Sequence, residues 1–541
     1  MKRFTIFLFM ISGIFFSRVN AQSVLEVPPL TDGQPTALNA FIQNDSTAPA
    51  DRVYKLERGK KYLFNQTCEI NRSLRITSDS LPLDVPPATV VAGPDPETAE
   101  LPDRWFYLTG SNIDLHISNI MISGVAPSQE YVGAWLFTLV GDSLDILYTN
   151  TIINGFGGGV TNVDKKGQQK ISFRAINCIF RNIQYQNHPF MGQSNKVKGA
   201  HQQLYLVKNC TFFNCNSYEV LLIRPCDSIL IEHNTFFGNT IQPFYNFYAV
   251  NETVRDNVFF AQFSFGVPKD ALDGGWFKDS IPGIISLHKL DPSFGIDEKD
   301  RKVVITNNAY FVPKAIDDYW QTAIDNGWDS ICVLKPQFIV PETQAMFDDD
   351  ENYPYLLAEN NYMDVDPGFR QGLVDTIVEQ RLDFNNKFAQ YSWDMPAERP
   401  YHYAPNGDIF NIPWPLPENL RYTNDTLMTA ATDGGPLGDP RWFASPAGIF
   451  SPKNSETIGL TVFPNPVVSN ATVSFTLDTK GRTTLKIYNV AGQLVKSIFD
   501  KDYLPGKYEV QFNTGDLPDG LYFIKLRANG KVATRKMIIN N

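Results

Sequence analysis

The stretch Leu204-Tyr-Leu-Val-Lys-Asn209-Cys-Thr-Phe-Phe-Asn214 decides the fold, because similar segments recur along the chain. Each copy has alternating apolar residues, then an Asn, then a short apolar run. Consecutive copies lie 23 to 50 residues apart. Repeats of this length are typical of stacked architectures, and period-2 alternation indicates strands rather than helices. The repeated residues are Asn119, Asn150, Asn177, Asn209, Asn234, Asn257 and Asn307.

The Asn of each copy is suited to the bend between two strands. Its side chain tolerates the left-handed backbone region and hydrogen-bonds to local backbone. A single strand of this kind cannot bury its apolar face alone, so stacked copies would build a continuous core. We therefore expect a parallel β-helix in which Asn150, Asn177, Asn209 and Asn234 lie in one column.

These copies resemble the right-handed parallel β-helix proteins of the pectate-lyase type. The resemblance implies an all-β fold, a right-handed parallel β-helix (solenoid) over residues 51–310. We expect residues 22–50 to be an extended leader and residues 311–444 to be an irregular region that flanks and caps the coil. The Ser, Pro and Gly content of residues 445–457 predicts a linker.

The chain begins with a pattern typical of a secretory signal peptide, residues 1–21. Lys2 and Arg3 precede an apolar stretch that is too short to span a bilayer comfortably. No other segment reaches the roughly 20 apolar residues that a transmembrane helix needs, so we expect no transmembrane segment.

Residues 458–541 form short alternating strands with Gly and Pro turns, which predicts a small β-sandwich. Segments such as Thr461-Val-Phe-Pro-Asn-Pro466 and Leu517-Pro-Asp-Gly-Leu-Tyr522 closely resemble the type A C-terminal sorting domain of the type IX secretion system. The resemblance implies that the secretion machinery is a partner. It also implies that the protein is secreted or held on the outer-membrane surface.

The composition excludes some classes of function. A net charge of −11 and a pI near 5.2 argue against a general nucleic-acid binder. The six Cys residues form no CxxC pair, so a zinc or redox motif is not expected. Cys178 and Cys210 each follow a repeat Asn, so they would lie on neighbouring turns. That placement permits a disulfide, although a buried stack of free thiols is the interpretation we favour.

A second family of strands precedes the Asn strands. In pectate-lyase-type proteins this sheet and its flanking loops form the substrate groove. Aligning the turn at Asp227 with Gln202 and Gln169 puts three cations on one face of successive turns: Lys166, Lys198 and Arg224. The candidate strands are Trp135 to Leu139, Val160 to Val163, Val220 to Arg224, Phe244 to Tyr248 and Ile284 to His288.

A local row of cations would suit an acidic polysaccharide. The first hypothesis is therefore a lyase that cleaves an acidic glycan by β-elimination, which resembles the Lys-plus-Arg arrangement of β-helix alginate and chondroitin lyases. Lys198 would be the base, Arg224 would stabilise the enolate and Lys166 would orient the substrate carboxylate. The proposed substrate-binding residues are Lys166, His201, Tyr245, Tyr248 and His288.

A non-catalytic surface protein that binds glycan or mediates adhesion is the alternative hypothesis. Each Lys is also explained as a solvated loop cation, and Arg224 as the partner of Glu219 or Asp227. The chain contains no GxSxG, HExxH or P-loop motif. We expect no metal and no cofactor.

Overall fold

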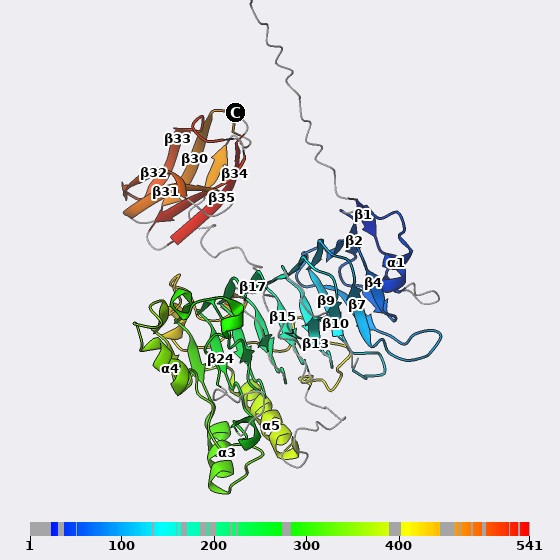
Figure 1. Ribbon diagram of the computed structural model, residues 1–541. Helices are drawn as coiled ribbons and strands as arrows, with labels where there is room; N and C mark the ends of the chain where they lie inside the picture. Colours follow the sequence, from blue (N-terminus) through cyan, green and yellow to red (C-terminus); the bar gives the residue numbers. More distant parts are fainter. Residues whose placement is uncertain are drawn as a thin grey trace, which may run out of the picture. The chain divides into compact units, whose positions relative to one another are not determined.

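The computed structural model forms two compact units that divide between Trp442 and Phe443 (Figure 1). The predicted signal peptide 1–21 and the predicted linker 445–457 lie outside the described residues. The structure describes residues 23–30, 37–49, 51–131, 135–157, 159–163, 170–183, 192–193, 202–216, 219–222, 226–272, 283–388, 402–443, 460–463, 465, 467–477, 480–489, 494–518, 520–528 and 531–539.

The first unit is a right-handed parallel β-helix, as the repeat predicts. Among the described strands, each turn from β2 to β16 passes from sheet A to sheet B and then to sheet C, whereas the later turns continue sheets A and B. All strand pairs within these three sheets are parallel and in register. Sheet A has 11 strands: β1 (Val24–Glu26), β2 (Val53–Leu56), β5 (Leu74–Ser78), β8 (Ile113–Ser118), β11 (Leu144–Thr149), β14 (Ser172–Ile176), β17 (Leu204–Lys208), β20 (Ile229–Glu232), β23 (Asn251–Arg255), β25 (Lys302–Thr306) and β27 (Leu356–Glu359).

Sheets B and C complete the coil. Sheet B comprises β3 (Lys61–Phe64), β6 (Ala88–Ala92), β9 (Ile120–Ser123), β12 (Ile152–Asn154), β15 (Ile179–Arg181), β18 (Thr211–Phe213), β21 (Thr235–Phe237), β24 (Val258–Phe260), β26 (Ala309–Phe311) and β28 (Tyr362–Met363). Sheet C comprises β4 (Cys68–Ile70), β7 (Arg104–Leu108), β10 (Trp135–Leu139), β13 (Gly159–Val163) and β16 (Gly192–Gln193), and the pair β19 (Val220–Leu221) and β22 (Phe244–Tyr245) follows separately.

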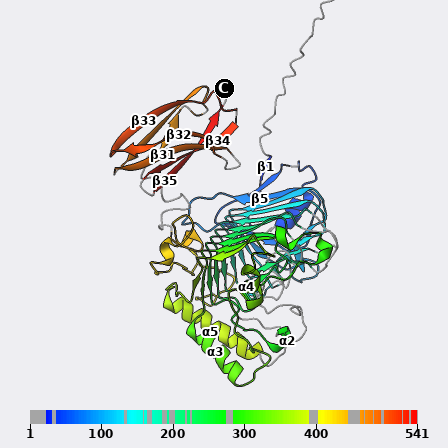
Figure 2. The same ribbon diagram turned by 60° about the vertical axis from the view of Figure 1, so that its left-hand side comes forward.

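Helices lie on the outside of the coil (Figures 1 and 2). Helix α1 packs on β3 and β4 at the N-terminal end and buries Leu38 and Ile42, so the predicted leader 22–50 contributes both β1 and this helix. The helices are α1 (Leu38–Asn44), α2 (Lys269–Leu272), α3 (Lys314–Asp325), α4 (Pro341–Phe347) and α5 (Gln371–Phe388), with 3-10 turns η1 (Pro292–Phe294), η2 (Glu298–Asp300), η3 (Leu427–Thr429) and η4 (Pro440–Phe443).

Stacked aromatic rings fill the core of the coil. Phe180, Phe212, Phe236 and Phe259 occupy one position on four successive turns, with ring centroids 5.0, 4.7 and 4.8 Å apart. All four side chains are fully buried. Offset stacking of this kind adds to the large apolar area that each ring removes from water. The repeated Phe after each Asn therefore becomes a continuous internal column.

The bend between sheets A and B carries the predicted Asn ladder. Asn119, Asn150, Asn177 and Asn209 all have φ between 50° and 58°, in the left-handed region. The side-chain amides of Asn150, Asn177 and Asn209 each donate to the carboxamide oxygen of the Asn on the preceding turn, at 3.1, 3.2 and 3.0 Å. We call this the outer column. Asn307 also adopts this backbone conformation, with φ of 54°.

Asn234 and Asn257 do not belong to the outer column. The expectation of a single column is therefore wrong for Asn234, which lies one residue beyond the left-handed position. The left-handed position on these turns is taken by His233 and Asp256, with φ of 55° and 61°. Asn234 is buried one residue later and donates to Asn257 at 3.0 Å, which in turn donates to Asn308 at 2.9 Å. His and Asp tolerate the left-handed region, which frees the Asn for this inner column.

The six cysteines are free and buried. Cys178 and Cys210 occupy the inner-column position on the turns that precede Asn234. The thiol of Cys210 lies 3.2 Å from the carbonyl of Lys208, and its backbone amide donates to Asn234 Oδ1 at 2.9 Å. The favoured interpretation, a stack of small buried thiols, agrees with this arrangement.

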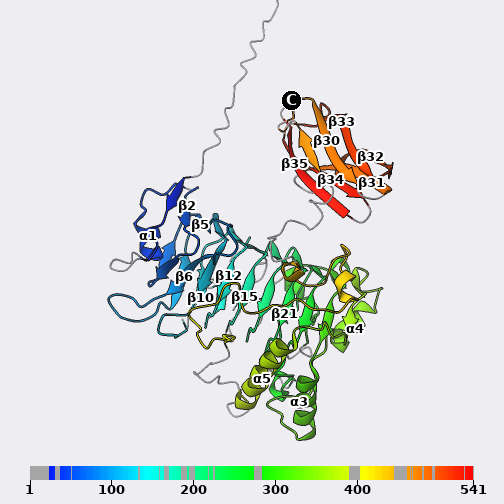
Figure 3. The same cartoon turned by 180° about the vertical axis from the view of Figure 1, so that it is seen from behind.

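Residues 402–443 form a strap across the outer face of sheet B (Figure 3). The side chains of Met121, Ile152 and Ile179 point out of the sheet and pack against strap residues. These strap residues are Ile412, Trp414, Leu416 and Trp442.

The strap is also anchored by polar contacts. Lys61 donates to Asn411 at 2.8 Å, and Thr211 donates to Asp439 at 2.8 Å. Because β3 and β18 are five turns apart in sheet B, the strap spans much of the coil.

The second unit is a β-sandwich with two antiparallel sheets, as the sequence predicts. Its own core includes Phe475, Leu485, Ile524 and Met537. One sheet has β29 (Thr461–Phe463), β30 (Asn470–Leu477) and β33 (Gly506–Asn513), and the other has β32 (Leu494–Tyr503), β31 (Gly481–Asn489), β34 (Gly520–Ala528) and β35 (Lys531–Ile539).

The outer column can be tested at Asn150, which donates to Asn119 and accepts from Asn177. Replacing Asn150 with Ala removes both bonds and also the short polar side chain that lets Asn tolerate a left-handed backbone, so we expect a loss of about 2–4 kcal/mol of stability. Asn150→Gly loses the same bonds without the backbone strain and should cost about 1 kcal/mol less. Urea unfolding followed by circular dichroism measures both. An Ala variant as stable as the Gly variant would contradict the role of the left-handed bend.

Candidate functional site

The predicted cation row lies outside the described residues. This applies to Lys166, Lys198, His201 and Arg224, so their roles stay predictions. The alignment of turns that placed these cations on one face is wrong by one residue at the part of it that the structure describes. Gln202 forms its parallel bridge with Cys226, not with Asp227. Successive strand residues point to opposite faces, so a shift of one residue removes the support that this alignment gave to a shared face.

The structure brings Tyr248 and His288 together. The imidazole of His288 stacks on Phe247, with centroids 4.1 Å apart and planes 10° apart, and Tyr248 meets it edge-on at 5.8 Å. Tyr248 is half-buried and His288 is buried. For Tyr245 the structure describes the backbone at the end of β22, but not the side chain. Contact of these three residues with a glycan stays a prediction.

A fully buried Arg holds the loops around His288 in place. The Arg301 guanidinium donates to the backbone carbonyls of Ala249, His288 and Phe247 at 2.6, 2.7 and 2.8 Å. Arg301 also forms an ion pair, at 3.3 Å, with the partly exposed Glu298. Three carbonyls from two separate segments are thus fixed by one cation. This geometry gives His288 a packing role next to the segment that follows β22.

Glu252 is a buried carboxyl next to this cluster. It lies on β23, is 2% exposed and accepts a hydrogen bond from Asn246. Burial raises the pKa of Glu252 to about 8, although the nearby Arg301 and the Asn246 bond act in the opposite direction. Removing a carboxylate from water disfavours its charged form, so Glu252 is largely protonated at neutral pH.

Sheet C carries a group of partly exposed side chains that the sequence analysis missed. Tyr107 on β7 is half-exposed, and the Arg104 guanidinium lies over its ring at 5.1 Å. Trp135 on β10 is half-exposed beside Arg104, and the exposed Glu69 on β4 is the register neighbour of Tyr107. We call these four residues the sheet C patch. The aromatic run Arg104-Trp-Phe-Tyr-Leu108 could have predicted this group of side chains. It was not singled out because it directly follows a Pro-rich stretch that is typical of a loop.

A polar hollow of about 390 Å³ adjoins the sheet C patch. Thr67 connects the two, because its hydroxyl donates to the Arg104 carbonyl at 2.9 Å. Asp95 accepts from Gln66 at 2.9 Å and from two backbone amides in its own turn. We call this the N-terminal hollow. Its lining residues are Gln43, Asn65, Gln66, Thr67, Asp95, Thr98, Glu100, Leu101, Pro102 and Asp103.

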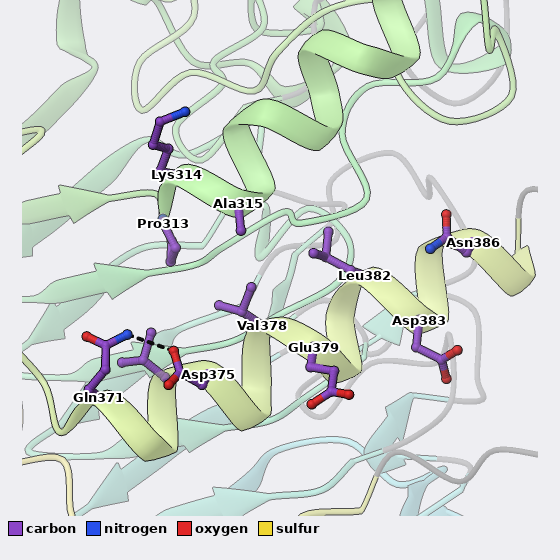
Figure 4. A pocket seen from close by; sticks show the side chains of 11 residues that line it. Pro313, Lys314, Ala315, Gln371, Asp375, Val378, Glu379, Leu382, Asp383 and Asn386 are labelled. Atoms are coloured by element: carbon purple, nitrogen blue, oxygen red, sulfur yellow. Dashed lines mark hydrogen bonds between the residues drawn. The ribbon is translucent and has the colours of Figure 1, made fainter.

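A second groove of about 610 Å³ lies between the start of α3 and helix α5 (Figure 4). Val378 and Leu382 of α5 point toward α3, whereas Glu379 and Asp383 point away from it. The groove therefore has an apolar floor and an acidic rim. Its described lining includes no aromatic side chain on which a sugar ring could stack.

The described residues include no group of three His, Cys, Asp or Glu side chains that could hold a metal ion. The neighbouring acids Asp317 and Asp318 on α3 make ion pairs with Lys335 at 2.9 Å and Lys314 at 2.6 Å, respectively. Among the described helices, none is long and apolar enough to cross a membrane.

Residues 461–540 match the family described as the secretion system C-terminal sorting domain. This match confirms the predicted address: the chain is exported by type IX secretion and is secreted or held at the cell surface. No pectate-lyase family matches the coil. No curated protein matches the sequence.

Glu252 should make stability depend on pH. Its pKa is about 8 in the folded chain and has an ordinary value of 4.5, so the folded state holds its proton more tightly. The free energy of unfolding should therefore fall as pH rises from about 4.5 to about 8, by up to about 5 kcal/mol. Glu252→Gln removes this loss, so we expect the variant to exceed the wild type in Tm at pH 9.

The matched control for that measurement is Glu359→Gln, at an exposed carboxylate on β27. It should shift Tm little at any pH. A Tm difference between Glu252→Gln and the wild type that does not change between pH 4 and pH 9 would contradict the buried, protonated carboxyl.

Proposed function

We propose that this exported protein binds a polysaccharide at the N-terminal end of its β-helix, through the sheet C patch and the N-terminal hollow. The resemblance to pectate-lyase-type proteins supports a glycan ligand on this sheet. The observation that carries the proposal is the partly exposed Tyr107, with the Arg104 guanidinium over its ring, next to a hollow lined by polar side chains.

The sheet C patch has the chemistry that sugar rings require. The apolar faces of a pyranose pack on aromatic rings, which offer a large rigid surface at low entropic cost. Arg104 covers part of the Tyr107 ring and presents several N–H donors for ring hydroxyls. Glu69, next to Tyr107, adds an acceptor. Both functions lie on neighbouring strands, whose spacing of about 4.8 Å is fixed by the sheet.

The N-terminal hollow favours an uncharged glycan over the acidic one expected from the sequence. Its lining includes the carboxylates Asp95, Glu100 and Asp103 and the amides Gln43, Asn65 and Gln66. Carboxylates accept hydrogen bonds from sugar hydroxyls but repel the carboxylate of a uronate. Three acids in one hollow therefore select for a hydroxyl-rich, neutral segment.

Cleavage of an acidic glycan by β-elimination is the second candidate. The observation in its favour is where two strands end: β13, in sheet C, ends at Val163 and β19, in the separate pair with β22, ends at Leu221, so each is followed along the chain by a proposed cation, Lys166 or Arg224. The assignment of Lys198 as base rests on sequence alone. This reaction would occur farther along the coil than the sheet C patch.

Binding can be measured by affinity electrophoresis of the mature protein in native gels that contain β-glucan, mannan or xylan, with pectate and alginate as acidic probes. We expect retardation by at least one neutral glycan. Tyr107→Ala removes the stacking surface and should raise Kd about three- to tenfold. Tyr355→Ala is the matched control, because Tyr355 is 59% exposed and lies beside β27, the last strand of sheet A, far along the coil from the sheet C patch.

Equal weakening by Tyr107→Ala and Tyr355→Ala, or retardation by none of the neutral glycans, would rule out the sheet C patch as the binding site. Ultraviolet absorbance from unsaturated ends, followed in the same mixtures with pectate and alginate, tests cleavage separately. A rise that is lost in Lys198→Ala would establish the second candidate.

A further inference from the structure

The sorting sandwich leaves a groove between two edge strands. Among the described strands, β32 and β33 each pair on one side only, with β31 and β30 respectively. They belong to different sheets, and a groove of about 610 Å³ lies between them. An edge strand presents a row of backbone N–H and C=O groups that can pair with another extended chain. Both walls of this groove are therefore suited to strand addition.

The floor of the groove consists of half-buried aromatic and aliphatic side chains. Tyr503 and Tyr508 meet edge-to-face at 4.6 Å, and Tyr508 stacks on the buried Phe475 at 5.5 Å. Ile498 and Val510 pack against the same core and are also half-buried. The sandwich core thus opens between the two sheets, and an added strand with apolar side chains would cover it.

The charge of the sandwich is opposite to that of the whole chain. Residues 461–541 contain 11 Lys and Arg against 6 Asp and Glu, whereas the whole chain carries a net charge of −11. Lys496, Lys501 and Glu509 line the groove, and Lys496 pairs with Asp516 at 2.5 Å. Lys501 is exposed, and its ammonium lies 4.9 Å from the centroid of the Tyr503 ring. Lys501 is therefore the cation of the groove that favours an acidic partner.

We propose that the groove between β32 and β33 is the surface through which the secretion machinery holds the sorting domain. The occupant is an extended segment of that machinery, with apolar side chains facing Tyr503 and Tyr508 and acidic side chains facing Lys501. It adds to an edge strand by main-chain hydrogen bonds, and its side chains give the specificity. The family match supplies the class of partner, and the groove supplies the mode of binding.

The test uses the full chain, made in a bacterium that has a type IX secretion system. Lys501→Glu reverses the charge of the groove at an exposed position, so we expect the surface or secreted fraction to fall at least about tenfold, with the chain retained in the periplasm. The control is Arg527→Glu, which makes the same change of charge at an exposed position on the central strand β34. It should be exported like the wild type.

A photo-crosslinking residue at Ser497 keeps the proposal falsifiable if Lys501→Glu does not fold, as judged by the thermal unfolding of the full chain. Ser497 is exposed and lines the groove. It should form a crosslink to a component of the secretion system in living cells, whereas the same residue at position 527 should not. Normal export of a folded Lys501→Glu chain, equal loss in both charge variants, or crosslinks that are the same at both positions would each overturn the proposal.

Discussion

The left-handed bend that follows the strands of sheet A from β8 onward is the constraint on which this part of the coil depends. One residue at the bend takes up positive φ on each of these turns, where the chain passes from sheet A to sheet B. Asn meets this demand on most of these turns, and His233 and Asp256 meet it after β20 and β23. The hydrogen-bonded amides then move to the inner column at Asn234. Cys210 joins the two columns, since its backbone amide donates to Asn234.

Buried arginines attach the peripheral segments to this coil. Arg181 pairs with Glu418 of the strap at 2.7 Å, and both side chains are almost completely buried. Arg381 of α5 donates to Asn214 and Asn216 next to sheet B. Burying the charged pair Arg181–Glu418 costs desolvation energy, which is offset only because further hydrogen bonds surround the pair. Arg181, for example, also donates to Asn154 at 3.0 Å. Removing one partner would leave an unpaired buried charge, so these contacts fix where the strap and α5 lie.

The sequence predicted the coil well, because its period and alternation are physical consequences of stacking. It did not predict the change of column, since Asn234 looks like Asn209 in a linear repeat, and only the pairing of Thr211 with Thr235 separates them. The candidate site was harder. Tyr107 has no repeat to mark it, and its partner Glu69 lies on the preceding turn, so their proximity follows from strand register alone. A one-residue error in register, such as aligning Gln202 with Asp227 instead of Cys226, changes which side chains share a face.

The charge of the ligand must be argued from local groups rather than from the net charge of the chain. At physiological ionic strength the screening length is about 8 Å, so distant charges contribute little at any one surface. Asp95, Glu100 and Asp103 lie within one hollow and act together on whatever enters it. The same reasoning separates the sorting sandwich, with its excess of Lys and Arg, from an otherwise acidic protein. One chain thus carries surfaces that differ in their local charge, which is why we propose a different partner for each: a neutral, hydroxyl-rich glycan at the hollow and an acidic extended segment at the groove of the sandwich.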